Sequence, residues 1–209
     1  MRNLFLSIDG IDGAGKSTQI ALLATWYAEQ GIEPVQVRDP GGTELGEAIR
    51  EILLHRQEIP LGIRAEMLLY MASRAQLVEE LIRPSLEAGR TVISDRYLLA
   101  NVVYQSVDGR LSPDTIWQVG AIATSQLYPD LTVILDLPPE IAMSRLQGGL
   151  DRLESRGIDY MRRVRQGFLE QAQRMPHGQC VIIDATQSPD QMHAAIVEAV
   201  RCAARAAQR

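Results

Sequence analysis

One eight-residue segment near the N-terminus limits the possible folds of this chain more than any other. Residues Gly10 to Ser17 match the pattern G-x-x-x-x-G-K-[ST]. They directly follow the apolar run Leu4 to Ile8 and open the helical pattern Lys16 to Gln30. In a strand-loop-helix unit of this kind, backbone N–H groups surround phosphate oxygens. The sequence therefore predicts a P-loop fold that binds ATP or GTP through Gly10, Ile11, Asp12, Gly13, Ala14, Gly15, Lys16, Ser17 and Thr18.

Two side chains of this loop have expected roles. Lys16 would reach the β and γ phosphates, and the Ser17 hydroxyl would bind Mg²⁺. The chain has 21 Lys and Arg residues, and Lys16 is the only lysine among them. The presence of the only lysine at this position indicates that a compact ammonium group is needed there and that an arginine guanidinium cannot replace it.

The order of the remaining elements predicts an α/β fold. Short β-rich runs alternate with longer helical patterns, which is typical of a five-stranded parallel sheet flanked by helices. The strands are expected at Leu4 to Ile8, Pro34 to Arg38, Thr91 to Ser94, Leu131 to Asp136 and Cys180 to Asp184. Besides Lys16 to Gln30, helices are expected at Ile63 to Glu87, Pro113 to Leu127, Pro139 to Leu146, Asp159 to Arg174 and Pro189 to Ala207. Pro84 should kink or end the helix expected at Ile63 to Glu87.

Composition limits the classes of partner. A chain of 209 residues, 46% of them apolar, can form one sizeable core, so a single domain spanning residues 1–209 is expected. The net charge of -5 argues against nucleic acid and anionic membranes as partners. The N-terminus lacks the anatomy of a signal peptide, and Cys180 and Cys202 have no metal-type spacing. We expect a cytoplasmic protein with a small substrate, no membrane partner and no zinc site.

Charged residues follow several of the expected strands. Ligands bind at the carboxyl ends of strands in open parallel sheets, so Asp12, Asp39, Asp95 and Arg96 should converge there. The segment from Arg38 to Thr43 forms a second loop at this edge, and its Asp39–Pro40 bond is a candidate cis peptide. An ordinary proline-glycine turn is the other interpretation of this loop.

Other features separate the classes of P-loop protein. A GTPase is disfavoured because the base-reading Asn-Lys-x-Asp is missing. A motor ATPase is disfavoured because the acid that ends the third expected strand, Asp95, is followed by Arg96, which suits a phosphate acceptor better than a water. Tyr70 and Arg74 share a helical face and can stack on a base and bind its edge, although a core residue beside a surface residue would look the same.

These residues resemble the thymidylate kinase family along the whole chain. Gly10 to Thr18 resembles its P-loop, Arg38 to Thr43 its R-E-P-G-G-T loop, and Asp95 to Tyr97 its D-R-[YH] motif. Leu150 to Arg152 resembles its lid, and Asp184 to Thr186 the loop near adenine. The resemblance implies a nucleoside monophosphate kinase with a short lid at about residues 144–156. It would phosphorylate dTMP to dTDP with ATP and Mg²⁺, as a homodimer.

The resemblance also implies individual roles. Asp12 would bind the sugar 3′-hydroxyl, Tyr70 would stack on thymine, and Arg74 would reach its O4. Lys16, Asp95 and Arg96 would act at the transferred phosphoryl group, with Ser17 and Asp95 near the metal. The remaining residues expected at dTMP are Arg38, Asp39, Arg50, Asn101, Tyr104 and Gln105.

The lid arginine is left open between two residues. The family keeps an extra catalytic cation either in the P-loop or in the lid, and Gly13 stands at the P-loop position. The chain therefore resembles the bacterial kind, in which Arg145 or Arg152 would cover the phosphoryl group. Asp39 in place of the usual Glu, and a lid with few arginines, depart from the family pattern.

Two alternatives follow from the residues alone. Another small-molecule P-loop kinase would act on a different nucleoside monophosphate or a deoxynucleoside. A P-loop regulator would bind ATP to switch a partner, and it would release no ADP in response to an acceptor.

Overall fold

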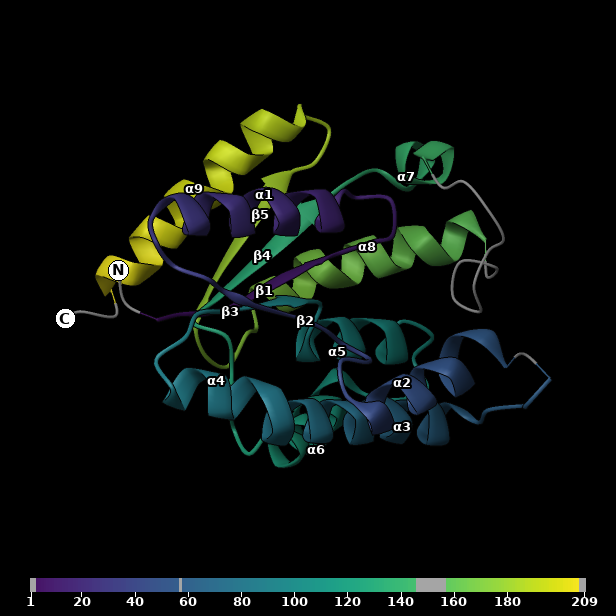
Figure 1. Cartoon of the computed structure of the whole chain (residues 1–209). Coiled ribbons are helices and arrows are strands. Elements are labelled where there is room, and N and C mark those ends of the chain that lie inside the picture. The colour runs from purple at the N-terminus through teal and green to yellow at the C-terminus, as the bar shows by residue number, and fades with distance from the viewer. Residues whose placement is uncertain (1–2, 57, 146–156, 207–209) are drawn as a thin grey trace.

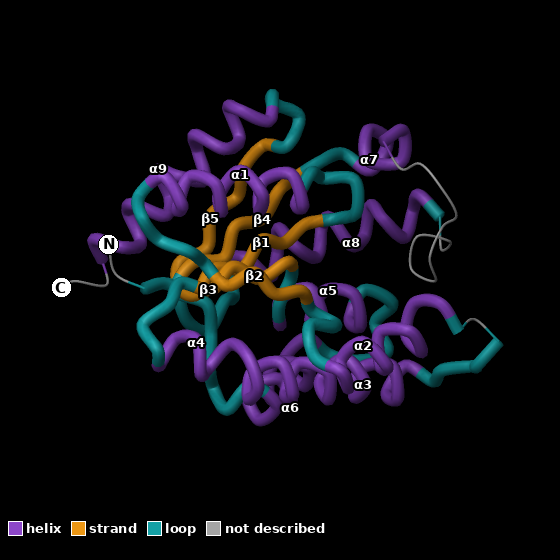
Figure 2. The backbone as a smooth tube through the Cα atoms, viewed as in Figure 1, coloured by secondary structure: helices purple, strands orange, loops and turns teal. Residues whose placement is uncertain are grey.

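The sheet lies at the centre of the molecule. The computed structural model describes residues 3–56, 58–145 and 157–206. Within these ranges, five parallel strands pair in the order β2-β3-β1-β4-β5. They form the sheet between the helices in Figure 2. The strands are β1 (Phe5–Gly10), β2 (Val35–Arg38), β3 (Val92–Asp95), β4 (Leu131–Asp136) and β5 (Gln179–Asp184). The central strand β1 leads directly into the P-loop, so this loop starts at the middle of the carboxyl edge.

Helices cover both faces of the sheet (Figure 1). On one face α1 packs against α9, and on the other face α5 contacts α3, α6 and α8. Parallel strands need this double cover, which is why they are apolar runs. The α-helices are α1 (Lys16–Glu29), α2 (Glu44–Arg50), α3 (Ile63–Leu77), α4 (Arg83–Glu87), α5 (Leu98–Ser106), α6 (Pro113–Ala123), α7 (Pro139–Arg145), α8 (Ile158–Ala172) and α9 (Pro189–Ala206). None of the described helices is long and apolar enough to cross a membrane.

The fold class and the five strands predicted from the sequence are confirmed, with β4 at its predicted bounds and no strand end shifted by more than two residues. Two helices were not expected. The first is α2, which is capped by Thr43: the Thr43 hydroxyl accepts a hydrogen bond from the Gly46 N–H at 2.9 Å. It continues into a π-helical turn, η1 (Glu51–His55). The second is α5, whose first eight residues are all buried, so it has no exposed charged face to mark it as a helix.

The expected helical span Ile63 to Glu87 is confirmed in its bounds, but its interruption lies before Pro84. Regular α3 ends at Leu77, and a π-helical turn, η2 (Val78–Ile82), leads into α4. Pro84 stands in the first turn of α4, where its missing N–H leaves no hydrogen bond unmade. Helix α6 ends at Ala123, four residues early, because Ser125 and Gln126 adopt the left-handed region with φ of 47° and 56°.

Candidate active site

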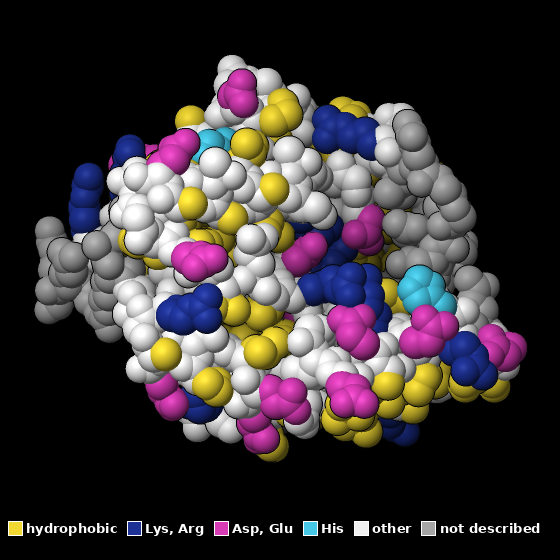
Figure 3. Space-filling view, in the orientation of Figure 1, with side chains coloured by type: hydrophobic (Ala, Val, Ile, Leu, Met, Phe, Trp, Pro, Cys, Tyr) yellow, Lys and Arg dark blue, Asp and Glu magenta, His cyan; other side chains and the backbone are white. Residues whose placement is uncertain are grey.

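A cleft of about 670 Å³ opens at the carboxyl ends of the strands. Its walls come from the P-loop, the loops after β2 and β3, and helices α3 and α5. The start of α9 closes the other end. In the space-filling view, basic and acidic side chains gather in the middle of the visible face, between the helices of the two layers (Figure 3).

The charge of the cleft is opposite to that of the chain. Six basic side chains among the described residues line it, against three acidic ones, whereas the whole sequence carries -5. A positive cleft in an acidic protein selects small anions through its local field. The six basic residues are Lys16, Arg38, Arg50, Arg74, Arg96 and Arg145, and the three acids are Asp12, Asp39 and Asp95.

The glycines of the P-loop give it its shape. Gly10, Gly13 and Gly15 have φ of 133°, 79° and 92°, a region that side chains rarely adopt. A Cβ at Gly13 would lie 2.8 Å from the Ala142 carbonyl oxygen of α7. The loop therefore packs against the backbone of α7 and leaves no room for a larger residue at position 13.

Lys16 and Arg96 converge on Asp12. The Lys16 Nζ donates to the carbonyl oxygens of Gly10 and Ile11 at 3.3 and 3.0 Å and to Asp12 Oδ1 at 3.2 Å. The Arg96 Nη2 donates to the same Asp12 Oδ1 at 2.6 Å, and its Nη1 donates to the Gly10 carbonyl at 2.9 Å. Arg96 has a φ of 65°, so the backbone turns sharply after β3 to present this side chain.

These contacts shift the pKa values of both partners. Burial alone raises the pKa of Asp12, but the charges of Arg96 and Lys16 outweigh it and hold the pKa well below its usual range. Burial, followed by the charge of Arg96, lowers the pKa of Lys16, and Asp12 opposes this. Phosphate oxygens would stabilise the Lys16 ammonium that burial disfavours.

Asp9 lies beneath this group at the end of β1. It is fully buried, and the Ser7 hydroxyl donates a short hydrogen bond to its Oδ2. Its Oδ1 has no hydrogen-bond partner within the described residues. Burial raises the pKa of Asp9 to about 6, although Ser7, Arg96 and Lys16 lower it.

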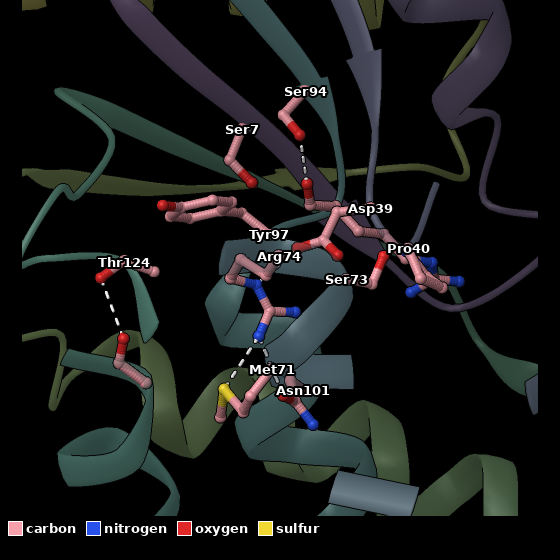
Figure 4. A network of polar contacts seen from close by, with 12 residues as sticks. Ser7, Asp39, Pro40, Met71, Ser73, Arg74, Ser94, Tyr97, Asn101 and Thr124 are labelled. Atoms are coloured by element: carbon pink, nitrogen blue, oxygen red, sulfur yellow. Dashed lines mark hydrogen bonds and ion pairs between the residues drawn. The ribbon is translucent and has the colours of Figure 1, made fainter. Parts of the chain in front are cut away.

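Arg74 is held between two elements in the interior, as Figure 4 shows. Its Nε donates to Asp39 Oδ2 at 2.5 Å, and its Nη1 donates to Asn101 Oδ1 at 2.9 Å and Met71 Sδ at 3.2 Å. The Asp39–Pro40 bond is cis, as the sequence suggested. Although only 1% exposed, Arg74 lines the cleft together with Tyr70, which lies one helical turn earlier on α3.

Arg38 and Arg50 approach the cleft from β2 and α2. Glu47 accepts two hydrogen bonds from Arg38 Nη2, both of 2.9 Å, and one from the Gly42 N–H at 2.8 Å. Arg50 Nη1 donates to the Pro40 carbonyl at 2.9 Å. Both guanidiniums are therefore hydrogen-bonded to protein groups, and an anionic ligand would have to compete with these groups.

Almost all the site residues expected from sequence that the structure describes line this one cleft. Gly10 and Ile11 do not: Ile11 packs in the core, and both offer carbonyl oxygens to Lys16. Arg145 reaches the cleft, with Nη1 3.4 Å from the Gly13 carbonyl. Arg152 and most of the expected lid lie outside the described residues.

Sequence reasoning missed several residues of the site. At the start of α9, Gln187, Pro189 and Met192 line the cleft, and Gln19 Nε2 donates to the Pro189 carbonyl at 2.9 Å. Glu47 and Glu66 contact predicted residues without lining the cleft. Glu66 could have been found from the sequence, because it stands four residues before Tyr70 on the apolar face of the same helix, where a glutamate is unusual.

Comparison with known proteins decides the family. The sequence profile of thymidylate kinase matches residues 8–196. The chain belongs to the thymidylate kinase family. A thymidylate kinase of Rhodopirellula baltica is 48% identical over 183 residues, 87% of this chain and 73% of that protein. Another, from Fervidobacterium nodosum, is 41% identical over 93% of this chain and 97% of that protein.

A solved structure agrees with this membership. The crystal structure of a thymidylate kinase from Ehrlichia chaffeensis superposes with a TM-score of 0.76 at 28% identity, covering 96% of this chain and all of that one. The predicted P-loop fold, the kinase class and the thymidylate kinase resemblance are therefore confirmed.

Proposed function

We propose that the cleft binds ATP and dTMP with their phosphates in line, and that the protein phosphorylates dTMP to dTDP. The observation that carries this proposal is the convergence of Lys16 from the P-loop and Arg96 from the end of β3 on one carboxylate, Asp12. This contact brings the loop that binds the phosphates of ATP next to an arginine that can bind the phosphate of an acceptor. The acceptor that fits this arrangement is a nucleotide that carries its own phosphate.

The proposed roles follow from position in the cleft. The P-loop through Thr18 holds the ATP phosphates, and Gln187, Pro189 and Met192 lie at the adenine end. Asp12 contacts the acceptor sugar, and Tyr70 and Arg74 bind the thymine. Arg38, Arg50 and Arg96 hold the acceptor phosphate. Four further residues that line the cleft complete the dTMP pocket around the base and sugar: Asp39, Asn101, Tyr104 and Gln105.

Phosphoryl transfer asks the protein mainly for alignment and charge. The acceptor phosphate is already an oxyanion, so no general base is needed. Lys16 and Arg96 stabilise the developing charge, and their contacts with Asp12 keep them in place before the ligands bind. Arg38 exchanges Glu47 for the acceptor phosphate.

The donor set fits a magnesium ion. Asp95 Oδ1 is buried and has no hydrogen-bond partner among the described residues, and the exposed Ser17 lines the same cleft. Mg²⁺ takes hard oxygen ligands, usually one or two protein groups plus phosphates. Ser17 and Asp95 would hold the ion, which neutralises phosphate charge when bound.

A lid at about residues 144–156, within a single domain spanning residues 1–209, is part of the proposal. Gly13 cannot carry a longer side chain beside α7, so the extra cation comes from Arg145 or Arg152. Closing the site would exclude water and prevent wasteful ATP hydrolysis.

A homodimer is also proposed. Leu45, Leu68 and Ile122 are 48%, 53% and 81% exposed and belong to α2, α3 and α6, which pack side by side. Sedimentation velocity tests this proposal: a species of twice 23.2 kDa supports it, and a monomer at micromolar concentration contradicts it. The cytoplasmic location and the lack of a nucleic-acid partner stay predictions.

An acceptor panel tests the proposed function. ADP release is measured with ATP and Mg²⁺ against dTMP, dUMP, dCMP, dGMP and thymidine. The proposal predicts the highest kcat/KM with dTMP. A preference for thymidine would favour a nucleoside kinase, and ADP release that ignores every acceptor would favour an ATP-binding regulator.

A further inference from the structure

A buried chain of hydrogen bonds runs away from Arg74, on the side opposite Asp39. Arg74 Nη1 donates to Asn101 Oδ1 at 2.9 Å, and Asn101 Nδ2 donates to Gln105 Oε1 at 2.5 Å. Gln105 Nε2 then donates to Glu66 Oε1 at 3.0 Å. Each of the four residues is at most 4% exposed. These hydrogen bonds therefore lie in the interior, where leaving a polar group without a partner costs free energy of folding.

The spacing of residues along α3 and α5 brings these four side chains together. Glu66 and Arg74 stand eight residues apart on α3, so they share the helical face that also carries Tyr70. Asn101 and Gln105 stand four residues apart on α5, which packs against α3. The two helices thus face each other with complementary polar groups.

The two end groups determine the direction of every hydrogen bond. A guanidinium can only donate, so the Asn101 atom that faces Arg74 must be its oxygen. The amide nitrogen of Asn101 then faces Gln105, which must present its own oxygen. The Gln105 nitrogen is left for Glu66, whose carboxylate accepts it. Arg74 at one end and a carboxylate that only accepts at position 66 at the other end together keep both amides from turning over.

Glu66 does not line the cleft, whereas Arg74, Asn101 and Gln105 do. Arg74 Nε and Nη1 are occupied by Asp39, Met71 and Asn101. Its Nη2 has no hydrogen bond in the part of the chain that the structure describes, and so it is the donor left for a ligand. A fixed donor suits the keto oxygen of thymine or uracil and rejects the amino group of cytosine.

We infer that Glu66 is a positioning residue for base selection, which acts through Gln105 and Asn101 to hold Arg74 where its free N–H groups can donate to a 4-keto pyrimidine. This inference rests on the proposed function, since it concerns the acceptor pocket of that reaction.

Glu66→Gln is the direct test, because glutamine has the same shape but both donates and accepts. KM and kcat are measured separately for dTMP, dCMP and ATP. The KM for dTMP is expected to rise about tenfold, and the ratio of kcat/KM for dTMP over dCMP to fall by at least about fivefold. The KM for ATP should stay unchanged. The exposed Glu79→Gln on η2 is the matched control and should change none of these values.

A second variant separates orientation from simple packing. In Glu66→Gln with Gln105→Glu, the acceptor-only group moves to position 105 and the amide to position 66. Asn101 Nδ2 and the amide at position 66 can then both donate to the carboxylate at position 105, so Asn101 keeps its orientation. This double variant should recover the base ratio to within about twofold of the unaltered protein. It also provides a test if the single variant fails to fold.

Three results would overturn the inference. One is a Glu66→Gln protein with an unchanged dTMP KM and base ratio. Another is an equal loss with dTMP and dCMP together with a lower melting temperature, which is the signature of a purely structural role. The third is a double variant no more selective than the single one. Failure of the proposed function looks different, since the unaltered protein would then release no ADP in response to dTMP.

Discussion

Arg96 Nη2 lies 2.6 Å from Asp12 Oδ1, although the two residues are 84 positions apart in the sequence. The contact links the end of β3 to the loop after β1, and these strands are neighbours in the sheet. It also places the Arg96 guanidinium 5.1 Å from the centre of the Tyr104 ring, close enough for a cation–π contact. The geometry holds Arg96 at the boundary between the donor and acceptor ends of the cleft.

Replacing Arg96 tests its role in the transfer. Arg96→Ala should lower kcat for dTMP by about 10²- to 10³-fold, because a charge that stabilises the transferred group is lost. ATP binding should stay within about threefold, since Lys16 and the P-loop amides remain. Steady-state kinetics and ATP titration calorimetry measure the two effects. Near-normal turnover would show that Arg96 is not needed at the phosphoryl group.

Lys16→Arg asks whether charge alone is sufficient. Lys16 is 7% exposed and reaches three oxygens of its own loop, so the larger guanidinium has no space there. Activity should fall at least about a hundredfold despite the retained charge. The conservative change in the opposite direction at an exposed position, Arg64→Lys, is the control and should leave kcat unchanged. Normal activity of Lys16→Arg would contradict this account of the only lysine.

The packing of the P-loop against α7 can be isolated with two glycines. Gly13 and Gly31 have similar φ of 79° and 73°, but only Gly13 has a neighbour within 4 Å of an added Cβ. Both Gly→Ala changes should cost at least about 1 kcal/mol through backbone strain. Gly13→Ala should cost more and also lower kcat, because it pushes α7 from the loop. Equal free energies of unfolding for the two variants, from urea denaturation, would rule out the clash.

Asp9 predicts a pH dependence of stability. Its pKa is about 6 in the folded state against 3.8 as the ordinary value. Between these values the folded state binds the extra proton, so the contribution of Asp9 to stability falls as pH rises from about 4 to 6. The fall amounts to at most about 3 kcal/mol. Asp12 acts in the opposite direction at lower pH, because its pKa is lowered.

Asp9→Asn should remove this fall while keeping an acceptor for Ser7. The gain in unfolding free energy of the variant over the unaltered protein should therefore grow from pH 4 to pH 7. Urea denaturation at several pH values measures it, with the exposed Asp190→Asn as control. A difference that does not vary with pH would mean that Asp9 titrates normally.

Much of the fold was predictable because its signals are local. Strands β1, β3 and β4 are largely apolar runs that are buried, and the edge strands β2 and β5 carry apolar residues but are only partly buried. The P-loop pattern identifies the first strand and helix. Helix α5 was missed because it is buried along nearly its whole length and carries no charged residue that would mark an exposed face. Helix α2 did carry signals: Thr43 as N-cap, Glu44 and Glu47 in the first turn and Arg50 in the last.

The candidate site was predictable where a motif names the residue. Strand ends and helical spacing indicated that Asp95, Arg96, Tyr70 and Arg74 could meet a ligand, and their individual roles came from the family resemblance. Partners such as Glu47 and Glu66 could not be assigned, because their contacts depend on how separate helices pack in three dimensions. The π-helical turn before Pro84 could not be predicted from the sequence either, since no residue type specifies such a turn.

The central claim is that this cleft moves the terminal phosphate of ATP to the phosphate of dTMP. Phosphorus NMR of a reaction with ATP, Mg²⁺ and dTMP tests it most directly, because it identifies every product. We expect one dTDP and one ADP for each ATP consumed, with inorganic phosphate near background. ADP that appears with inorganic phosphate and without dTDP would contradict it.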